Sequence, residues 1–284
     1  MPSYRILNNI TGWFCFAVAF CTYLLTAEPT ASFWDCGEFI AAADKLQIGH
    51  PPGAPMFLLM ARLFAMLAPS PDKVAWMVNA FSALLSAFTI LFLCWSITHI
   101  ARRVFQVQGL KDSKNQLFSY SIIQLSGVIG ALAYTFSDTF WFSAVEGEVY
   151  GASSFFTAIV FWAMLKWEEA ADQPYANRWL ILIAYLMGLS IGVHLLNLLA
   201  IPAIALIYYF RKYEPTRNGV ILAILCSALI LGGILYGIIP GIVKIAGYFE
   251  LLLSTHSECP TIPAYWCISC CWWQLFHGGF GILT

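Results

Sequence analysis

Long apolar runs alternate with short polar links along most of this chain. A membrane-spanning helix needs about 20 mainly apolar residues, and residues 10–26, 76–100, 117–136, 151–165 and 219–239 form runs of roughly that kind. The longer run 179–210 predicts two short helices that turn near residues 194–197. The pattern therefore predicts an all-α fold, a polytopic transmembrane helix bundle of about seven spans.

Two shorter segments follow the first apolar run. Segment 55–67 is too short to cross a bilayer and carries Arg62, so we expect an interfacial or re-entrant helix. Segment 35–48 has helical periodicity, with Phe39, Ala42 and Leu46 on one side and Gly49 as a C-terminal stop. The first loop is therefore predicted to contain interfacial helices.

Composition supports a membrane protein. Hydrophobic residues make up 60% of the chain and charged residues only 10%, whereas a soluble domain has about a quarter charged residues. The net charge of −1 and the lack of a basic tract give no indication of nucleic-acid binding. The first apolar run lacks a small-residue cleavage site and reads as a retained signal anchor.

Basic residues predict the orientation. With a cytoplasmic N-terminus, the inner side holds ten Lys and Arg residues and the outer side four, which fits the positive-inside rule. The inner set is Arg5, Arg102, Arg103, Lys111, Lys114, Lys166, Arg178, Arg211, Lys212 and Arg217, and the outer set is Lys45, Arg62, Lys73 and Lys244. Because most acids outside the spans then fall on the outer side, we expect the chemistry there.

The first outer loop carries Asp35, Glu38 and His50, and ionisable groups beside hydrocarbon indicate function. Asp35 and Glu38 are three residues apart and share a helix face. An Asp at the N-cap with a Glu three residues later is also close to a capping box, so helix capping alone is the competing interpretation. His50 is equally open to reading as an ordinary surface group.

Two further outer turns carry polar groups. Glu146 and Glu148 would point to different sides of a helix, so we expect at most one of them to face Asp35. The third turn carries His194 and Asn197. Solvation at the interface is the alternative for all of these residues, although three turns offering polar groups at one membrane level exceed what a plain bundle requires.

Three motifs carry a family resemblance. They are Trp-Asp-Cys-Gly-Glu-Phe at 34–39, His-Pro-Pro-Gly-Ala-Pro at 50–55 and Ala-Val-Glu-Gly-Glu-Val-Tyr at 144–150. Together they resemble polytopic membrane glycosyltransferases of the GT-C superfamily, in a bacterial branch similar to the protein O-mannosyltransferases. The resemblance covers roughly residues 5–250. Members are usually longer, so this chain resembles an N-terminal portion.

The resemblance implies an inverting enzyme that moves a hexose, mannose in particular, from a polyprenyl-phosphate carrier to Ser or Thr hydroxyls of exported proteins. It implies Asp35 as the catalytic base, with Glu38 orienting Asp35 or meeting the acceptor. Substrate contacts are assigned to His50, Arg62, Glu146, Glu148, His194 and Asn197. We expect no metal and no cofactor besides the lipid-linked donor. The expected location is the bacterial inner membrane, with the active face periplasmic.

Other functions remain open. A transporter or flippase of lipid-linked sugars would place ionisable groups in mid-span, often at broken helices, and an inactive membrane remnant of a longer enzyme is a third reading. Residues 1–253 form the expected transmembrane domain. Residues 254–284 form a Cys- and Trp-rich tail, which we interpret as truncated or frameshifted rather than as a metal cluster of His256, Cys259, Cys267, Cys270, Cys271 and His277.

Overall fold

The computed structural model describes residues 4–51, 53–107 and 116–256 of the chain. These residues are mostly helical and contain no strand, and the predicted all-α polytopic bundle is confirmed. The chain forms two compact units, Met1–Val220 and Ile221–Thr284. The predicted domain boundary at residue 253 falls within the helix Ile239–His256 and stays a prediction.

The long helices of the first unit follow the predicted apolar runs. They are α1 (Tyr4–Leu25), α4 (Val74–Val107), α5 (Gln116–Thr135), α7 (Val149–Ala170), α8 (Asn177–Ile191) and α9 (Ile201–Lys212). The 3-10 helix η3 (Leu195–Ala200) separates α8 from α9, where the sequence predicts a turn. The links contain α2 (Cys36–Lys45), α3 (Pro55–Ala65), η1 (Pro71–Lys73) and α6 (Asp138–Val145).

Six helical segments of the described residues are long and apolar enough to cross a membrane. The sequence predicts about seven, and the difference is α8, which has 15 residues. Its last turn ends at Gly192, whose backbone N–H closes on the Leu189 carbonyl. The early stop shortens α8 below the length of an ordinary span.

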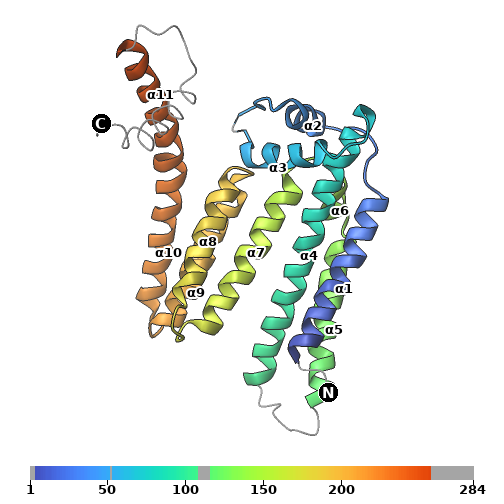
Figure 1. Cartoon of the computed structure of the whole chain (residues 1–284). Helices are drawn as coiled ribbons and strands as arrows, with labels where there is room; N and C mark the ends of the chain where they lie inside the picture. The colour runs from blue at the N-terminus through green and yellow to red at the C-terminus, as the bar shows by residue number, and fades with distance from the viewer. Residues whose placement is uncertain (1–3, 52, 108–115, 257–284) are drawn as a thin grey trace, which may run out of the picture. The chain divides into compact units, whose positions relative to one another are not determined.

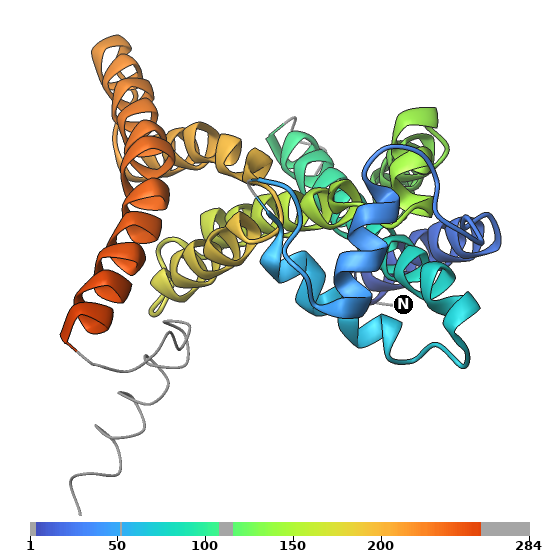
Figure 2. The ribbon, with the colours of Figure 1, turned by 90° about the horizontal axis from the view of Figure 1, so that it is seen from above.

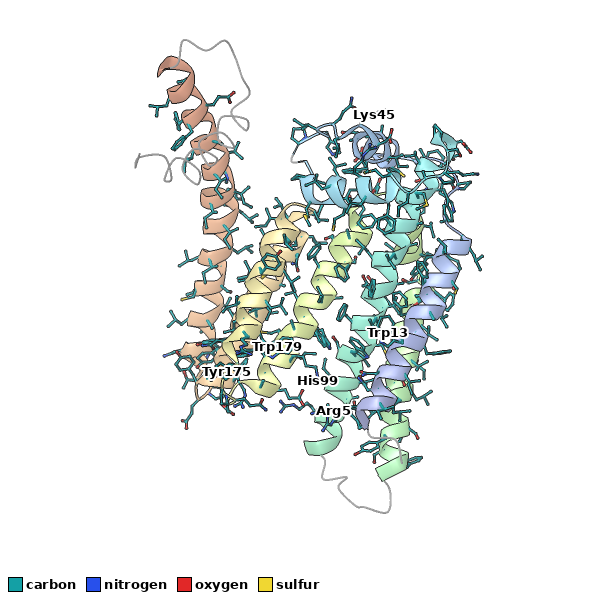
Figure 3. The ribbon with its side chains drawn as sticks, viewed as in Figure 1. Arg5, Trp13, Lys45, His99, Tyr175 and Trp179 are labelled. Atoms are coloured by element: carbon teal, nitrogen blue, oxygen red, sulfur yellow. The ribbon has the colours of Figure 1, made fainter. Side chains whose placement is uncertain are left out.

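The first unit has two distinct ends. The short helices α2, α3 and α6 lie at one of them, which we call the α2 end (Figure 1). Seen from above, α2 and α3 lie over the ends of the long helices (Figure 2), as expected for interfacial helices. Arg5 and the α7–α8 link with Tyr175 lie at the other end, which we call the Arg5 end (Figure 3).

Charge is distributed unevenly between these ends. Most basic residues of the first unit belong to helix ends or links at the Arg5 end (Figure 1), namely Arg5, Arg102, Arg103, Lys166, Arg178, Arg211 and Lys212. The α2 end has Lys45, labelled in Figure 3, with Arg62 of α3 and Lys73 of η1. Within the described residues, this is the asymmetry that the positive-inside rule describes when the Arg5 end is cytoplasmic.

An aromatic series fixes the α2 end on the bundle. Phe39 of α2 packs against Phe57 of α3 with 5.5 Å between ring centroids, and Phe57 packs against Phe81 of α4 at 5.7 Å. All three rings are buried, and aromatic pairs contribute roughly 0.5–1.5 kcal/mol each beyond their buried area. The series holds the segment that carries α2 and α3 on α4, the central helix of the unit.

The described part of the second unit, residues 221–256, is a continuous helical run. It contains most of α10 (Arg217–Gly232), the π-helical turn η4 (Gly233–Ile238) and α11 (Ile239–His256). The stretch Arg217–Leu252 is long and apolar enough to cross a membrane and includes the predicted span 219–239. The cysteines of the tail, which the sequence offers as candidate metal ligands, lie outside the described residues.

Candidate active site

The α2 end brings together Asp35, Glu38 and His50, which we call the acid–histidine cluster. The chain leaves α2 through Leu46, at a φ of 51°, and bends back at His50. The His50 backbone N–H donates to Glu38 Oε1 at 2.6 Å, and His50 Nδ1 lies 3.1 Å from Glu38 Oε2. On the other side of the ring, His50 Nε2 lies 3.8 Å from Asp35 Oδ2.

The capping-box interpretation of the two acids is wrong. Asp35 directly precedes α2, but its side chain makes no capping hydrogen bond. Glu38 faces His50 instead of the start of the helix. The physical reason is the returning chain, which offers Glu38 both a backbone donor and a ring nitrogen. The Asp35 carboxylate is 57% exposed and remains accessible from outside the unit.

The hydrogen bonds from His50 determine the protonation state of Glu38. The His50 backbone N–H and then its ring lower the pKa of Glu38 below its ordinary value, so Glu38 is ionised at neutral pH. An ionised carboxylate beside Nδ1 favours a proton on that nitrogen. Nε2 is then the ring atom that faces Asp35, as a base in the neutral ring or as a donor in the imidazolium.

The same three side chains could also hold a metal ion. Among the described residues, Asp35, Glu38 and His50 each offer one ligand atom, and these atoms lie within 4.8 Å of one another. Carboxylate oxygens and imidazole nitrogens suit divalent ions such as Mn²⁺ and Zn²⁺. Glu38 and His50 also satisfy each other by hydrogen bonds without a metal. The geometry fits both cases, so the expected absence of a metal stays a prediction.

Glu146 and Glu148 lie beside the cluster in the link between α6 and α7. The sequence-based expectation that they occupy different sides of a helix is wrong, because the backbone at both residues is extended. Between them, the Glu148 backbone N–H donates to the Glu146 carbonyl at 2.9 Å, so the chain makes a tight turn at Gly147. Glu146 accepts a hydrogen bond from Ser32 Oγ, and the Asp35 backbone N–H bonds to Glu148. Both acids therefore face the segment that leads into α2.

Burial changes the acidity of this pair. Glu146 is 3% exposed and Glu148 5%. Desolvation raises the pKa of Glu146. Desolvation, together with the neighbouring charges of Glu146 and Asp35, raises the pKa of Glu148 to about 7. A carboxyl group that is half protonated near neutral pH beside an exposed carboxylate is a feature typical of sites that move protons.

Asn79 and Gly147 position the cluster, and sequence reasoning did not single them out. Asn79 of α4 is fully buried, and its amide donates to the Glu28 and Thr30 carbonyls at 2.6 and 3.0 Å. A Cβ added at Gly147 would lie 2.9 Å from Asn79 Oδ1, so only glycine allows this approach. The available signals were an amide inside an apolar run and a glycine between two glutamates.

The turn between α8 and η3 also reaches the α2 end. The Met56 backbone N–H at the start of α3 donates to the Gly192 carbonyl at 2.7 Å. His194 begins η3, where its Nδ1 accepts from the Leu196 backbone N–H at 3.1 Å. Its ring lies 5.6 Å from that of Tyr150, two residues after Glu148. The three turns that the sequence predicts on the outer side therefore contact one another at the α2 end. Burial lowers the pKa of His194.

Two predicted substrate contacts have other partners. Arg62 of α3 binds the Asp44 carboxylate at 2.9 Å and also donates to the Asp44 carbonyl, which ties α3 to α2. Asn197 is fully buried, and its amide donates to Ser190 Oγ at 2.9 Å. No described contact joins either residue to the acid–histidine cluster, and their assignment to substrate stays a prediction.

The fold and the site define a class of protein, an all-α polytopic membrane bundle with ionisable groups gathered at one end. A family model described as the protein O-mannosyl-transferase TMEM260 N-terminal domain matches residues 35–217. The chain belongs to this family. The match begins at Asp35 and includes every site residue predicted from the sequence.

Known relatives extend well beyond the matched region. The chain is 27% identical over 176 residues to protein O-mannosyl-transferase TMEM260 of Mus musculus, covering 62% of this chain and 22% of the relative. It is 24% identical over 139 residues to protein O-mannosyl-transferase tmem260 of Dictyostelium discoideum, covering 49% and 14%. The chain thus spans less than a quarter of these relatives. No solved structure matches it.

Proposed function

We propose that this chain is the N-terminal membrane part of a protein O-mannosyltransferase of the inverting GT-C type. The observation that carries the proposal is the acid–histidine cluster at the α2 end, located where the family match begins. The donor is a mannosyl group on a polyprenyl phosphate. The acceptor is a Ser or Thr hydroxyl of an exported protein.

A hydroxyl is a weak nucleophile, so a base must take its proton as the glycosidic bond forms. We assign this role to Asp35, whose carboxylate is exposed and whose backbone is fixed at the start of α2. The acceptor oxygen attacks the sugar carbon opposite the phosphate, its proton passes to Asp35, and the polyprenyl phosphate leaves with the bonding electrons. One such displacement inverts the sugar carbon.

The positioning roles follow from the contacts of the cluster. Glu38 orients the His50 ring through its hydrogen bonds, and a protonated His50 would give the leaving phosphate a positive charge. His194 lies near Tyr150 and offers a second ring donor, because its Nδ1 already accepts from the backbone. Arg62 is paired with Asp44, so its guanidinium is less available to the leaving phosphate than the two histidine rings.

Orientation in the membrane is part of the proposal. The greater number of basic residues at the Arg5 end supports a cytoplasmic N-terminus and an outward-facing α2 end. The site then faces the periplasm in a bacterial inner membrane, the location we propose. The relatives compared above come from an amoeba and a mouse, so the bacterial setting rests on the sequence resemblance alone.

The distribution of charge favours an enzyme over a transporter. In the described spans of the first unit, ionisable side chains lie near helix ends, as with Arg5 in α1 and Lys166 in α7. Transporters instead place such groups near the membrane midplane, often at broken helices. Chemistry at the interface fits this distribution better.

A transfer assay with the full-length gene product tests the proposal. Mannosyl transfer from polyprenyl-phosphate mannose to a Ser/Thr acceptor peptide is measured for the wild type, Asp35→Asn and the control Asp138→Asn. Asp138 is an exposed acid of α6 at the same end. We expect Asp35→Asn to lose at least about a hundredfold in rate, as for removal of a general base, and the control to retain activity. Near-normal turnover in purified, monodisperse Asp35→Asn would refute the assignment.

A further inference from the structure

A cavity of about 210 Å³ lies at the Arg5 end, between α1, α4 and α7. Tryptophans form part of its lining: Trp95 of α4 and Trp162 of α7 have ring centroids 5.7 Å apart. Tyr4 and Asn8 of α1 line it as well. Three helices that are long and apolar enough to cross a membrane thus enclose a partly aromatic, partly polar space.

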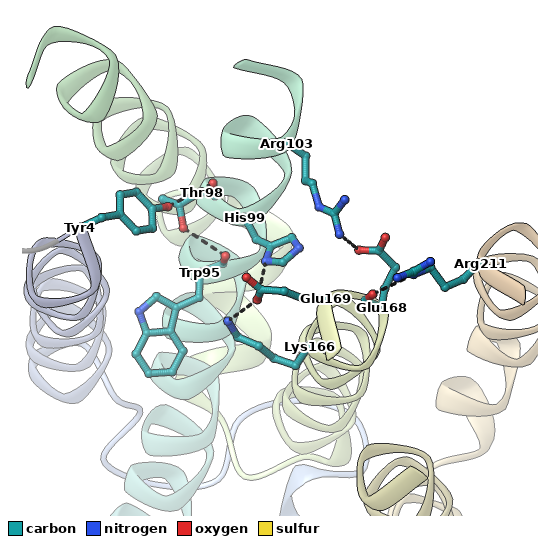
Figure 4. Close-up of polar contacts among 9 residues, drawn as sticks. All are labelled: Tyr4, Trp95, Thr98, His99, Arg103, Lys166, Glu168, Glu169 and Arg211. Atoms are coloured by element: carbon teal, nitrogen blue, oxygen red, sulfur yellow. Dashed lines mark hydrogen bonds and ion pairs between the residues drawn. The ribbon is translucent and has the colours of Figure 1, made fainter. Parts of the chain in front are cut away.

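The cavity also gathers basic side chains, two of which, His99 and Lys166, are drawn in Figure 4. Arg102, Lys166 and His99 line it. The Arg102 guanidinium lies over the Tyr4 ring, 4.7 Å from the centroid, and no hydrogen bond joins it to another described residue. Neighbouring Arg103, by contrast, is paired with Glu168. The N–H donors of Arg102 therefore have no hydrogen-bond acceptor among the described residues.

One carboxylate, that of Glu169, balances part of this charge. It lies 3.3 Å from Lys166 Nζ and 4.0 Å from His99 Nδ1. Two permanent cations against one anion leave the lining positive. Two buried polar atoms of lining residues, Asn8 Oδ1 and His99 Nε2, have no partner among the described residues. Orphaned buried groups of this kind call for a water, an ion or a ligand.

The position of the cavity selects the class of ligand. His99 follows Asn79 by 20 residues along α4, which corresponds to about 30 Å of helix, close to the thickness of a bilayer core. Because Asn79 supports the α2 end, the cavity lies at the opposite membrane interface. The same helix α1 exposes Ile6, Ile10 and Phe14 on another of its faces, an apolar surface on which acyl chains can lie.

We propose that this cavity binds the phosphate of an acidic phospholipid. Arg102 and Lys166 contact the phosphate oxygens, the tryptophans line the headgroup space, and the acyl chains lie along α1. Basic pockets between membrane helices suit such headgroups, and the Asn8 amide oxygen suits a headgroup hydroxyl. The site is separate from the acid–histidine cluster, so its test needs no transferase activity.

Native mass spectrometry of the purified, delipidated full chain tests the proposal, with phosphatidylglycerol as the probe and phosphatidylcholine as the neutral comparison. We expect the wild type to prefer phosphatidylglycerol. Arg102→Gln with Lys166→Gln should weaken that binding about tenfold or more, from the loss of two interfacial charges. Binding of phosphatidylcholine should not change.

A matched control separates the cavity from general surface charge. Arg178→Gln with Arg217→Gln removes two positive charges from the starts of α8 and α10, outside the cavity, and should leave phosphatidylglycerol binding unchanged. If the cavity variant does not fold, Asn8→Asp keeps both cations and should still weaken binding by placing a negative charge in the cavity.

Three outcomes would overturn the proposal. The first is equal loss of phosphatidylglycerol binding in the cavity variant and the control, which would indicate a diffuse surface effect. The second is unchanged binding in the cavity variant and in Asn8→Asp. The third is binding of glycerol 1-phosphate or inorganic phosphate as tight as that of phosphatidylglycerol, which would assign the cavity to a soluble phosphate.

Discussion

Glu148 gives the folded protein a pH dependence that can be measured. Its carboxyl group is buried beside Glu146 and close to Asp35, which raises its pKa from 4.5 to about 7. In the unfolded chain the group loses its proton near pH 4.5, whereas the folded protein retains that proton up to about pH 7. The folded state therefore binds more protons within this window. The free energy of unfolding should fall as pH rises through it and level off above about pH 7.

The magnitude follows from the two pKa values. Each unit of difference between the folded and unfolded pKa corresponds to about 1.4 kcal/mol, so the burial of Glu148 costs about 3 kcal/mol of folding stability at pH 8. Glu148→Gln removes this titration, and its amide oxygen can still accept the Asp35 backbone N–H. The variant should match the wild type near pH 5 and exceed it by up to about 3 kcal/mol at pH 8. Asp138→Asn, which removes an exposed acid, is the control.

Thermal unfolding in detergent between pH 5 and pH 8, followed by tryptophan fluorescence, measures this difference. The midpoint of the wild type and of Asp138→Asn should fall across this range relative to that of Glu148→Gln. A pH profile of Glu148→Gln parallel to that of the wild type would refute the reasoning, because Glu148 would then titrate as an ordinary carboxyl group. A loss of stability in the variant at every pH would show instead that the carboxylate is needed as an acceptor.

Further predictions concern the support and the chemistry of the site. Gly147→Ala should destabilise the protein by about 1–3 kcal/mol, because its Cβ would lie within 3.0 Å of Asn79 and Val78 atoms. The control Gly188→Ala, with no described atom within 4 Å of the added Cβ, should leave stability unchanged. Equal thermal midpoints of the two variants would contradict the packing argument. Asn79→Ala should lower transfer more than membrane insertion, since the link into α2 loses two hydrogen bonds; unchanged turnover would count against a positioning role. Transfer should persist in excess EDTA, and a loss that Mn²⁺ restores would identify the acid–histidine cluster as a metal site.

The local pattern of the chain was sufficient for the helices. Apolar runs with polar links gave the spans, and the short segment at 55–67 gave α3, because hydropathy and period act within one element. The turn between α8 and α9 followed from the excessive length of one run. The sequence also singled out Asp35, Glu38 and His50 as a motif, since ionisable groups stand out in a chain that is 10% charged.

Contacts between elements needed the tertiary structure. From the sequence, Glu38 fits either a helix cap or a pair with a histidine. Only the return of the chain to His50 in the folded structure distinguishes these two roles. The same holds for Arg62. The sequence assigns it to a substrate contact, and only the packing of α3 beside α2 shows that it pairs with Asp44.

Local patterns in the sequence were enough to predict the class of the protein, a helical membrane bundle, and the loop that carries its acids. The burial of Glu146 and Glu148 in one link between α6 and α7, and the raised pKa of Glu148, became visible only once the helices were packed together. The same packing forms the basic cavity at the Arg5 end. The reason is physical: helix formation depends on neighbouring residues, whereas desolvation and charge pairing depend on groups that only packing brings together.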